Sequence, residues 1–137
     1  MDLSSEWKNC ALGDILTFQR GYDLPKSKMS GGKFPVIGSN GIIGWHDEYT
    51  TEAPGITVGR SGNVGKPFII NKPSWSHNTT LFIKKFKNSD PTFIYYFLKT
   101  LKLKEYAGRV LSQHSIKTIY MKFQLKYRLI SMKSKNC

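Results

Sequence analysis

The stretch Ile56-Thr57-Val58-Gly59-Arg60-Ser61-Gly62-Asn63-Val64-Gly65 decides what kind of fold the rest of the chain must form. Its first three residues are β-branched, which is typical of a strand. Three glycines within seven residues follow, and they let the backbone turn tightly and approach a partner closely. The next apolar run, residues 67–70, reads as a return strand. This part of the chain therefore predicts strands joined by short connections.

Other runs on both sides of this stretch have the same character. The pair Asn40-Gly41 lies between two apolar runs and predicts a hairpin. Residues 12–16 predict a single helical turn with Asp14 as its cap, and residues 19–33 predict an exposed polar loop. Further extended segments are predicted at residues 7–10, 34–37, 42–45 and 79–83, with a polar loop at 71–78 that carries Trp75.

The period changes after residue 83. Asp90-Pro91 is typical of a helix start, and apolar residues at helical spacing extend the predicted helix from Pro91 to about Leu103. Residues 115–119 predict a short helical turn, and residues 120–123 a final strand. Because strands precede the main helix, we expect an α+β domain with a mixed or mostly antiparallel sheet and short flanking helices.

Composition limits the class of protein. A chain of 137 residues has the length of one domain. With 39% hydrophobic and 13% aromatic residues, it can form a hydrophobic core. It shows neither an apolar run long enough for a membrane span nor a secretory signal, so we expect a cytoplasmic protein that does not contact membranes. Two cysteines, Cys10 and Cys137, are too few for a disulfide framework or a zinc site.

The formal net charge is +12, and it is unevenly distributed. Residues 1–80 carry a net charge of +1, whereas residues 81–137 carry +11. Such a basic field favours a polyanionic partner, most often nucleic acid, although lysines that only solubilise a surface would give the same count.

The residue patterns of common catalytic sites are missing from the sequence. The histidines His46, His77 and His114 show no metal-binding spacing. The glycine-rich segment ends in Gly65-Lys66, but Pro67 follows where a phosphate-binding loop needs a hydroxyl. Asp47-Glu48 reads as a solvated turn. We therefore expect neither catalysis nor a metal nor a cofactor.

The glycine-rich segment carries side chains that suit DNA. Arg60 presents a forked donor set that fits guanine O6 and N7 or a phosphate. Ser61 and Asn63 can hydrogen-bond phosphates or base edges, and Lys66 adds a phosphate contact. The alternative is a plain glycine-rich hairpin whose charges are solvated.

A second group of candidates surrounds Trp75. Asn78 has the chemistry to read adenine, and Ser76 or His77 to contact phosphate. Trp75 itself is more simply explained by packing than by stacking on a base. Gln19, Arg20 and Tyr22 are further candidates for base contacts, and Lys26, Lys28 and Lys72 for contacts with the DNA backbone.

Taken in order, these segments resemble the target recognition domain of type I restriction-modification specificity subunits. The resemblance runs over residues 6–123, and its strongest part is the segment 56–65. Further pieces are Trp7 followed by Leu12-Gly13-Asp14-Ile15, then Gly21, the run 35–44, the loop 73–79, the predicted helix and residues 112–119. We identify the chain on this basis as a member of that family.

The resemblance implies that residues 1–123 form a domain that recognises one half-site of a double-stranded DNA target. It also implies that the domain has no catalytic activity itself and works with modification (methyltransferase) and restriction subunits. The chain departs from the family plan in two ways, because the long spacer helix is absent and residues 124–137 form a divergent basic tail. The alternative is a non-catalytic interaction fragment that binds modification subunits without recognising DNA.

Overall fold

The computed structural model describes residues 7–87, 89–101, 103, 105, 112 and 120–124, with residues 7–11 and 120–124 described by their backbone. In chain order the elements, in which η marks a 3-10 turn, are β1 (Trp7–Ala11), η2 (Leu12–Asp14), β2 (Leu16–Arg20), η3 (Lys26–Lys28), β3 (Phe34–Gly38), β4 (Gly41–His46), β5 (Gly55–Gly59), β6 (Pro67–Ile70), β7 (Trp75–Ser76), β8 (Thr80–Phe86), α1 (Pro91–Thr100) and β9 (Tyr120–Gln124).

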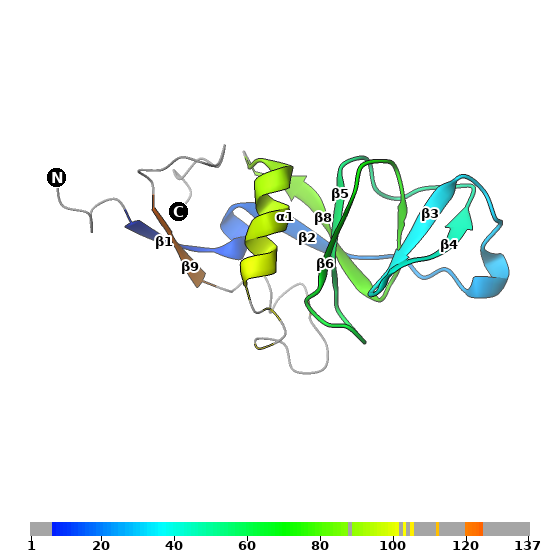
Figure 1. Cartoon of the computed structure of the whole chain (residues 1–137), viewed down its shortest axis with the longest axis horizontal. Coiled ribbons are helices and arrows are strands. Elements are labelled where there is room, and N and C mark those ends of the chain that lie inside the picture. Colours follow the sequence, from blue (N-terminus) through cyan, green and yellow to red (C-terminus); the bar gives the residue numbers. More distant parts are fainter. Residues whose placement is uncertain are drawn as a thin grey trace.

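These strands form separate small sheets. The largest has the order β2-β8-β5-β6 and is antiparallel throughout. A second sheet has the order β4-β3-β7, in which β3 and β7 are parallel, and β1 pairs with β9. The β1–β9 pair lies at one end of the long axis and β3 and β4 at the other, with α1 and the four-stranded sheet between them (Figure 1).

The hydrophobic core lies between α1 and the four-stranded sheet. Ile94 and Leu98, one turn apart on α1, are fully buried against it. The sheet contributes Ile56 and Val58 from β5, and every residue of β5 is buried because other strands flank it on both sides. The remaining core side chains are Leu12, Ile15, Leu16, Phe18, Leu81, Ile83 and Leu103.

Most of the expected elements are confirmed. The α+β class, the hairpin at Asn40-Gly41 and the strands after it are present, and the strand expected at 120–123 forms β9. The parallel β3–β7 pairing makes the otherwise antiparallel arrangement mixed. No helix among the described residues is long and apolar enough to cross a membrane. The turn expected at 115–119 and the tail after Gln124 lie outside the described residues.

Four local predictions need correction. The helix ends at Thr100 rather than near Leu103, because Leu101 is extended and its N–H bonds to the Leu98 carbonyl. Asp14 is the last residue of η2 and not its cap. Gln19 and Arg20 belong to β2 instead of a loop, since they pair with β8. The loop expected at 71–78 contains β7, which pairs with β3.

The start of α1 follows the sequence prediction. Asp90 is the N-cap, and its carboxylate accepts a hydrogen bond of 3.2 Å from the Phe93 N–H. Pro91, which has no N–H to satisfy, occupies the first turn.

Replacing Asp90 with alanine should therefore destabilise the domain. We expect Asp90→Ala to lower the free energy of unfolding by about 1 kcal/mol, because one N–H at the helix start loses its partner. Urea unfolding of the full chain measures the change. Asp90→Asn is the matched control and should retain most of the stability, since asparagine caps helices equally well. Equal losses in both variants would contradict the capping role.

Candidate nucleic-acid interface

Three loops meet at one end of the four-stranded sheet. Strands β2 and β5 are both antiparallel to β8, which lies between them, so they run in the same direction. The residues that follow β2 and β5 must therefore lie beside the residues that precede β8. We call this region the convergent end and define it as residues 19–23, 60–66 and 77–79. Most of the site residues expected from the sequence lie within these three segments.

Backbone hydrogen bonds hold the three segments together. The Gly21 N–H donates to the Thr80 carbonyl at 3.0 Å, and the Arg60 N–H donates to the Thr79 carbonyl at 2.8 Å. The His77 N–H reaches the Ile37 carbonyl of β3 at 2.9 Å. The turn before β8 is thus bonded to both larger sheets.

Gly21 is the closest point of this junction. A Cβ atom on Gly21 would lie 2.0 Å from the His77 carbonyl oxygen, a distance that no side chain tolerates. This approach lets the Tyr22 N–H donate to the Ser76 carbonyl at 2.8 Å. The indole N–H of Trp75 then donates to the Tyr22 carbonyl at 3.1 Å. Only glycine at this position allows the chain leaving β2 to lie directly on β7 and the turn after it.

Arg60 is held from two directions. Besides its backbone bond, its guanidinium Nη1 donates to the Asn78 carbonyl at 3.2 Å. Partial burial lowers the pKa of Arg60, and the nearby charge of Arg20 lowers it further. Arginine titrates far above neutral pH, so Arg60 remains charged.

In the part of the chain that the structure describes, neither arginine is paired with an acidic side chain. The ion pair found among the described residues joins His46 to Asp47, so neither Arg20 nor Arg60 has a described carboxylate within 4 Å. Two cations without a described acidic partner at one end of a sheet, one of them bonded to a carbonyl, form an environment that attracts an anion.

The turn before β8 is bonded within itself. The His77 ring Nδ1 lies 3.1 Å from the Thr79 hydroxyl, and the Thr80 hydroxyl donates to the His77 carbonyl at 2.7 Å. The Asn78 amide donates to the Asp23 carboxylate at 3.3 Å, which joins this turn to the segment after β2. His77 and Asn78 therefore lie at the convergent end in defined positions.

The β3–β4 turn extends the same surface. Asn63 of the glycine-rich loop donates a 2.9 Å hydrogen bond to the Asn40 side chain, and both residues are exposed. Ser39 packs closely on this loop, since a Cβ at Gly59 would lie 3.1 Å from the Ser39 Cβ. The sequence places Asn40 only in a hairpin turn, and no local pattern indicates its contact with Asn63.

Other predicted site residues have different surroundings. The Ser76 side chain is fully buried, and its hydroxyl lies 2.7 Å from that of Thr51. Trp75 is half-buried against His46 and Tyr22, with ring centroids at 5.2 and 6.3 Å, which agrees with a packing role. Gln19 donates to the Tyr22 hydroxyl, and Ser61 and Lys66 lie in the glycine-rich loop.

The other three lysines predicted to contact DNA lie near the three-stranded sheet. Lys26 and Lys28 are exposed on η3, whose following residue Met29 contacts Gly44 of β4. Lys72 lies with its Nζ 5.2 Å from the centre of the Trp45 ring. These three cations are thus outside the convergent end.

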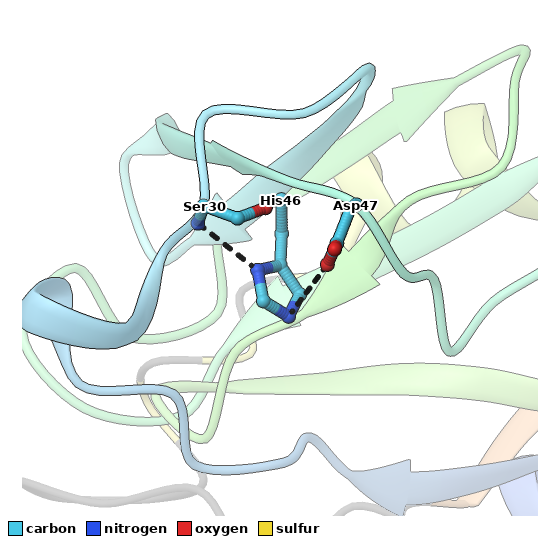
Figure 2. A network of polar contacts seen from close by, with 3 residues as sticks. All are labelled: Ser30, His46 and Asp47. Carbon is cyan, nitrogen blue, oxygen red and sulfur yellow. Dashed lines mark hydrogen bonds and ion pairs between the residues drawn. The ribbon is translucent and has the colours of Figure 1, made fainter.

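His46 fastens the chain near η3 to β4. Figure 2 shows its ring between Ser30 and Asp47. The ring Nδ1 accepts the Ser30 N–H at 3.2 Å, and Nε2 lies 3.6 Å from the Asp47 carboxylate. The described part of the chain contains no group of three or more His, Cys, Asp or Glu residues that could hold a metal ion.

Comparison with known proteins places the fold. The family model of the type I restriction modification DNA specificity domain matches residues 4–127, and the chain belongs to this family. No curated protein matches the chain.

Solved structures show the same fold. The S subunit of a type I restriction-modification system from M. genitalium superposes with a TM-score of 0.73 at 22% identity, over 89% of this chain and 35% of that one. The HsdS subunit from Thermoanaerobacter tengcongensis gives 0.68 at 14% identity, over 92% and 35%. A type I R-M structure described in terms of complex assembly and conformational transition gives 0.71 at 14% identity, over 90% and 35%. The chain thus spans about a third of the length of each matched structure.

The Gly21 contact generates a stability prediction. Gly21→Ala should lower the free energy of unfolding by about 3 kcal/mol or more, because the new methyl group collides with backbone that cannot move independently. Gly31→Ala is the control: Gly31 has a φ of 74° but open space around it, so only backbone strain of about 1 kcal/mol is added. Urea unfolding of both variants measures the difference, and equal midpoints would refute the role of the Gly21 contact.

Proposed function

We propose that the convergent end recognises one half-site of a double-stranded DNA target. The observation that carries this proposal is the presence of Arg20 and Arg60, uncompensated by described carboxylates, beside polar side chains from three converging loops. Phosphate contacts position a protein on DNA, whereas hydrogen bonds to base edges specify the sequence. The convergent end supplies both kinds of group on one surface.

The roles within this interface follow from the contacts of each residue. Arg60 has one nitrogen engaged by the Asn78 carbonyl, which leaves the other N–H groups of its guanidinium for guanine or a phosphate. His77, Asn78 and Asn63 offer hydrogen bonds from defined turns, and Lys66 supplies a contact with the DNA backbone. Lys26, Lys28 and Lys72 would contact the DNA backbone from outside the convergent end. Ser76 is buried and is left out of this interface.

The wider function proposed is that of a specificity component. In this role the domain carries no catalytic activity itself and directs the modification and restriction subunits of a type I complex in the cytoplasm. Family membership supports this proposal. Because the chain spans about a third of the matched structures, the activity of a whole complex is part of the proposal for this chain.

A second function is favoured by a different surface. Strand β4 exposes Ile42, Ile43 and Trp45 at 47%, 38% and 41% of their areas. Neighbouring apolar side chains on a surface are common at protein–protein contacts. They support the alternative of an interaction fragment that binds a modification subunit without recognising DNA.

Salt titration tests the proposal of DNA recognition. Duplex affinity should fall steeply as salt rises, because phosphate contacts release counterions. If Arg60 reads a base, Arg60→Ala should weaken the free energy of DNA binding by about 1–3 kcal/mol. It should also relax the sequence preference at one base pair. Lys99→Ala, which removes one charge from α1, is the control and should leave the sequence preference unchanged. Salt-insensitive binding, or no binding at low salt, would overturn the proposal.

Substitutions of exposed residues on β4 test the alternative that the chain binds a modification subunit. Trp45→Ala and Ile42→Ser should reduce co-purification with the modification subunit if β4 is a docking strand, since each removes exposed apolar area. Their duplex affinities should match that of the unmodified chain. Tyr96→Ala, which removes an exposed aromatic ring from α1, is the control. Unchanged co-purification would exclude β4 as the contact.

A further inference from the structure

The Asn40 and Asn63 side chains form an amide pair that bridges two turns. Asn63 lies in the loop between β5 and β6, and Asn40 lies in the turn between β3 and β4, so the pair joins the two larger sheets. Both residues are exposed, and the one hydrogen bond between them is 2.9 Å long. That bond fixes the position of one amide relative to the other.

The single bond leaves part of each amide free for a ligand. Asn63 uses one N–H, which leaves its carbonyl oxygen as an acceptor. Asn40 uses its carbonyl oxygen, which leaves its NH2 group as a donor. Reversing both amides exchanges the two residues but leaves the same set, one acceptor beside one donor. The pair therefore offers solvent one acceptor and one donor, carried by two amides that are bonded to each other.

The backbone around the pair is tightly constrained. Gly41, which follows Asn40, has a φ of 107°, and Gly62, which precedes Asn63, has a φ of 75°. A Cβ at Gly62 would lie 3.2 Å from the Ser39 hydroxyl, so the two turns are in close contact. The amides are thus held by a preorganised backbone, which reduces the entropy lost when they bind a ligand.

We propose that Asn40 and Asn63 act as one unit that reads the major-groove edge of adenine. Adenine presents the N7 acceptor beside the N6 amino donor, which matches the donor and acceptor left free by the pair. Guanine presents two acceptors, N7 and O6, so its O6 would face the free acceptor of the pair without a hydrogen bond. This inference rests on the proposed function, because it assigns one base preference to the surface formed by the convergent end and the β3–β4 turn beside it.

Selection from a duplex library with a randomised central segment tests the pairing. The full chain should select adenine over guanine at one position by about ten- to a hundred-fold. Asn40→Ala and Asn63→Ala should each abolish that preference, and the double variant should lose no more than either single one because the residues act together. Asn71→Ala, which changes an exposed asparagine at the opposite end of β6, is the matched control.

A modified base identifies the contact chemically. Replacing the selected adenine with 7-deazaadenine removes the N7 acceptor, so the unmodified chain should lose about ten-fold in affinity or more. Asn40→Ala should bind both duplexes equally, because its donor is already missing. Asn40→Asp, which retains the shape of the side chain but cannot donate, serves where the alanine variant unfolds and should also bind both equally.

The outcomes separate the two proposals. A chain that selects no sequence overturns the proposed function and this inference with it. A chain that selects a sequence whose preferences survive both alanine substitutions overturns only the inference. Uniform loss of affinity across all sequences, with the adenine preference retained, shows that the amide pair merely joins the turns and also overturns it.

Discussion

The arrangement of the molecule depends on a close main-chain contact between Gly21 and His77. Because Gly21 has no side chain, the chain leaving β2 can lie against the His77 carbonyl, where a Cβ atom would be only 2.0 Å from the oxygen. From this contact Tyr22 reaches Ser76 in β7, and His77 in turn reaches Ile37 in β3. Gly21 thus joins the four-stranded sheet to the three-stranded one at the position where the three loops converge.

Backbone hydrogen bonds connect the three segments of the convergent end. Arg60 is positioned by its main-chain N–H and by one guanidinium nitrogen on the Asn78 carbonyl, so its remaining N–H groups need not hold the fold together. The convergent end lies in the first 80 residues, whose net charge is only +1, whereas the excess of +11 lies in residues 81–137. The local charge of the two arginines, which have no acidic partner among the described residues, is therefore a better indicator of an anionic partner than the total of +12.

Local patterns predicted the strand before Arg60 and the helix start at Asp90, because both depend on neighbours in the sequence. Asn40 was recognised only as part of a turn, since its partner Asn63 is 23 residues away and the contact arises from the packing of two hairpins. Ser76 was expected to be available for phosphate, but its strand β7 pairs with β3, and its hydroxyl is buried against Thr51. Burial of a short strand is decided by its partners, which are distant in the sequence.

The sequence by itself determined the α+β class, the hairpin, the cap of α1 and the family resemblance, because turn chemistry, side-chain periodicity and motif order are local properties. Only the tertiary structure decided that β8 lies between β2 and β5, which brings the loops after Arg20 and Arg60 to one end. Strand order results from non-local hydrogen bonds and from the burial of Ile56, Val58 and Leu81 beneath α1. The positions of the polar side chains relative to one another follow from that order.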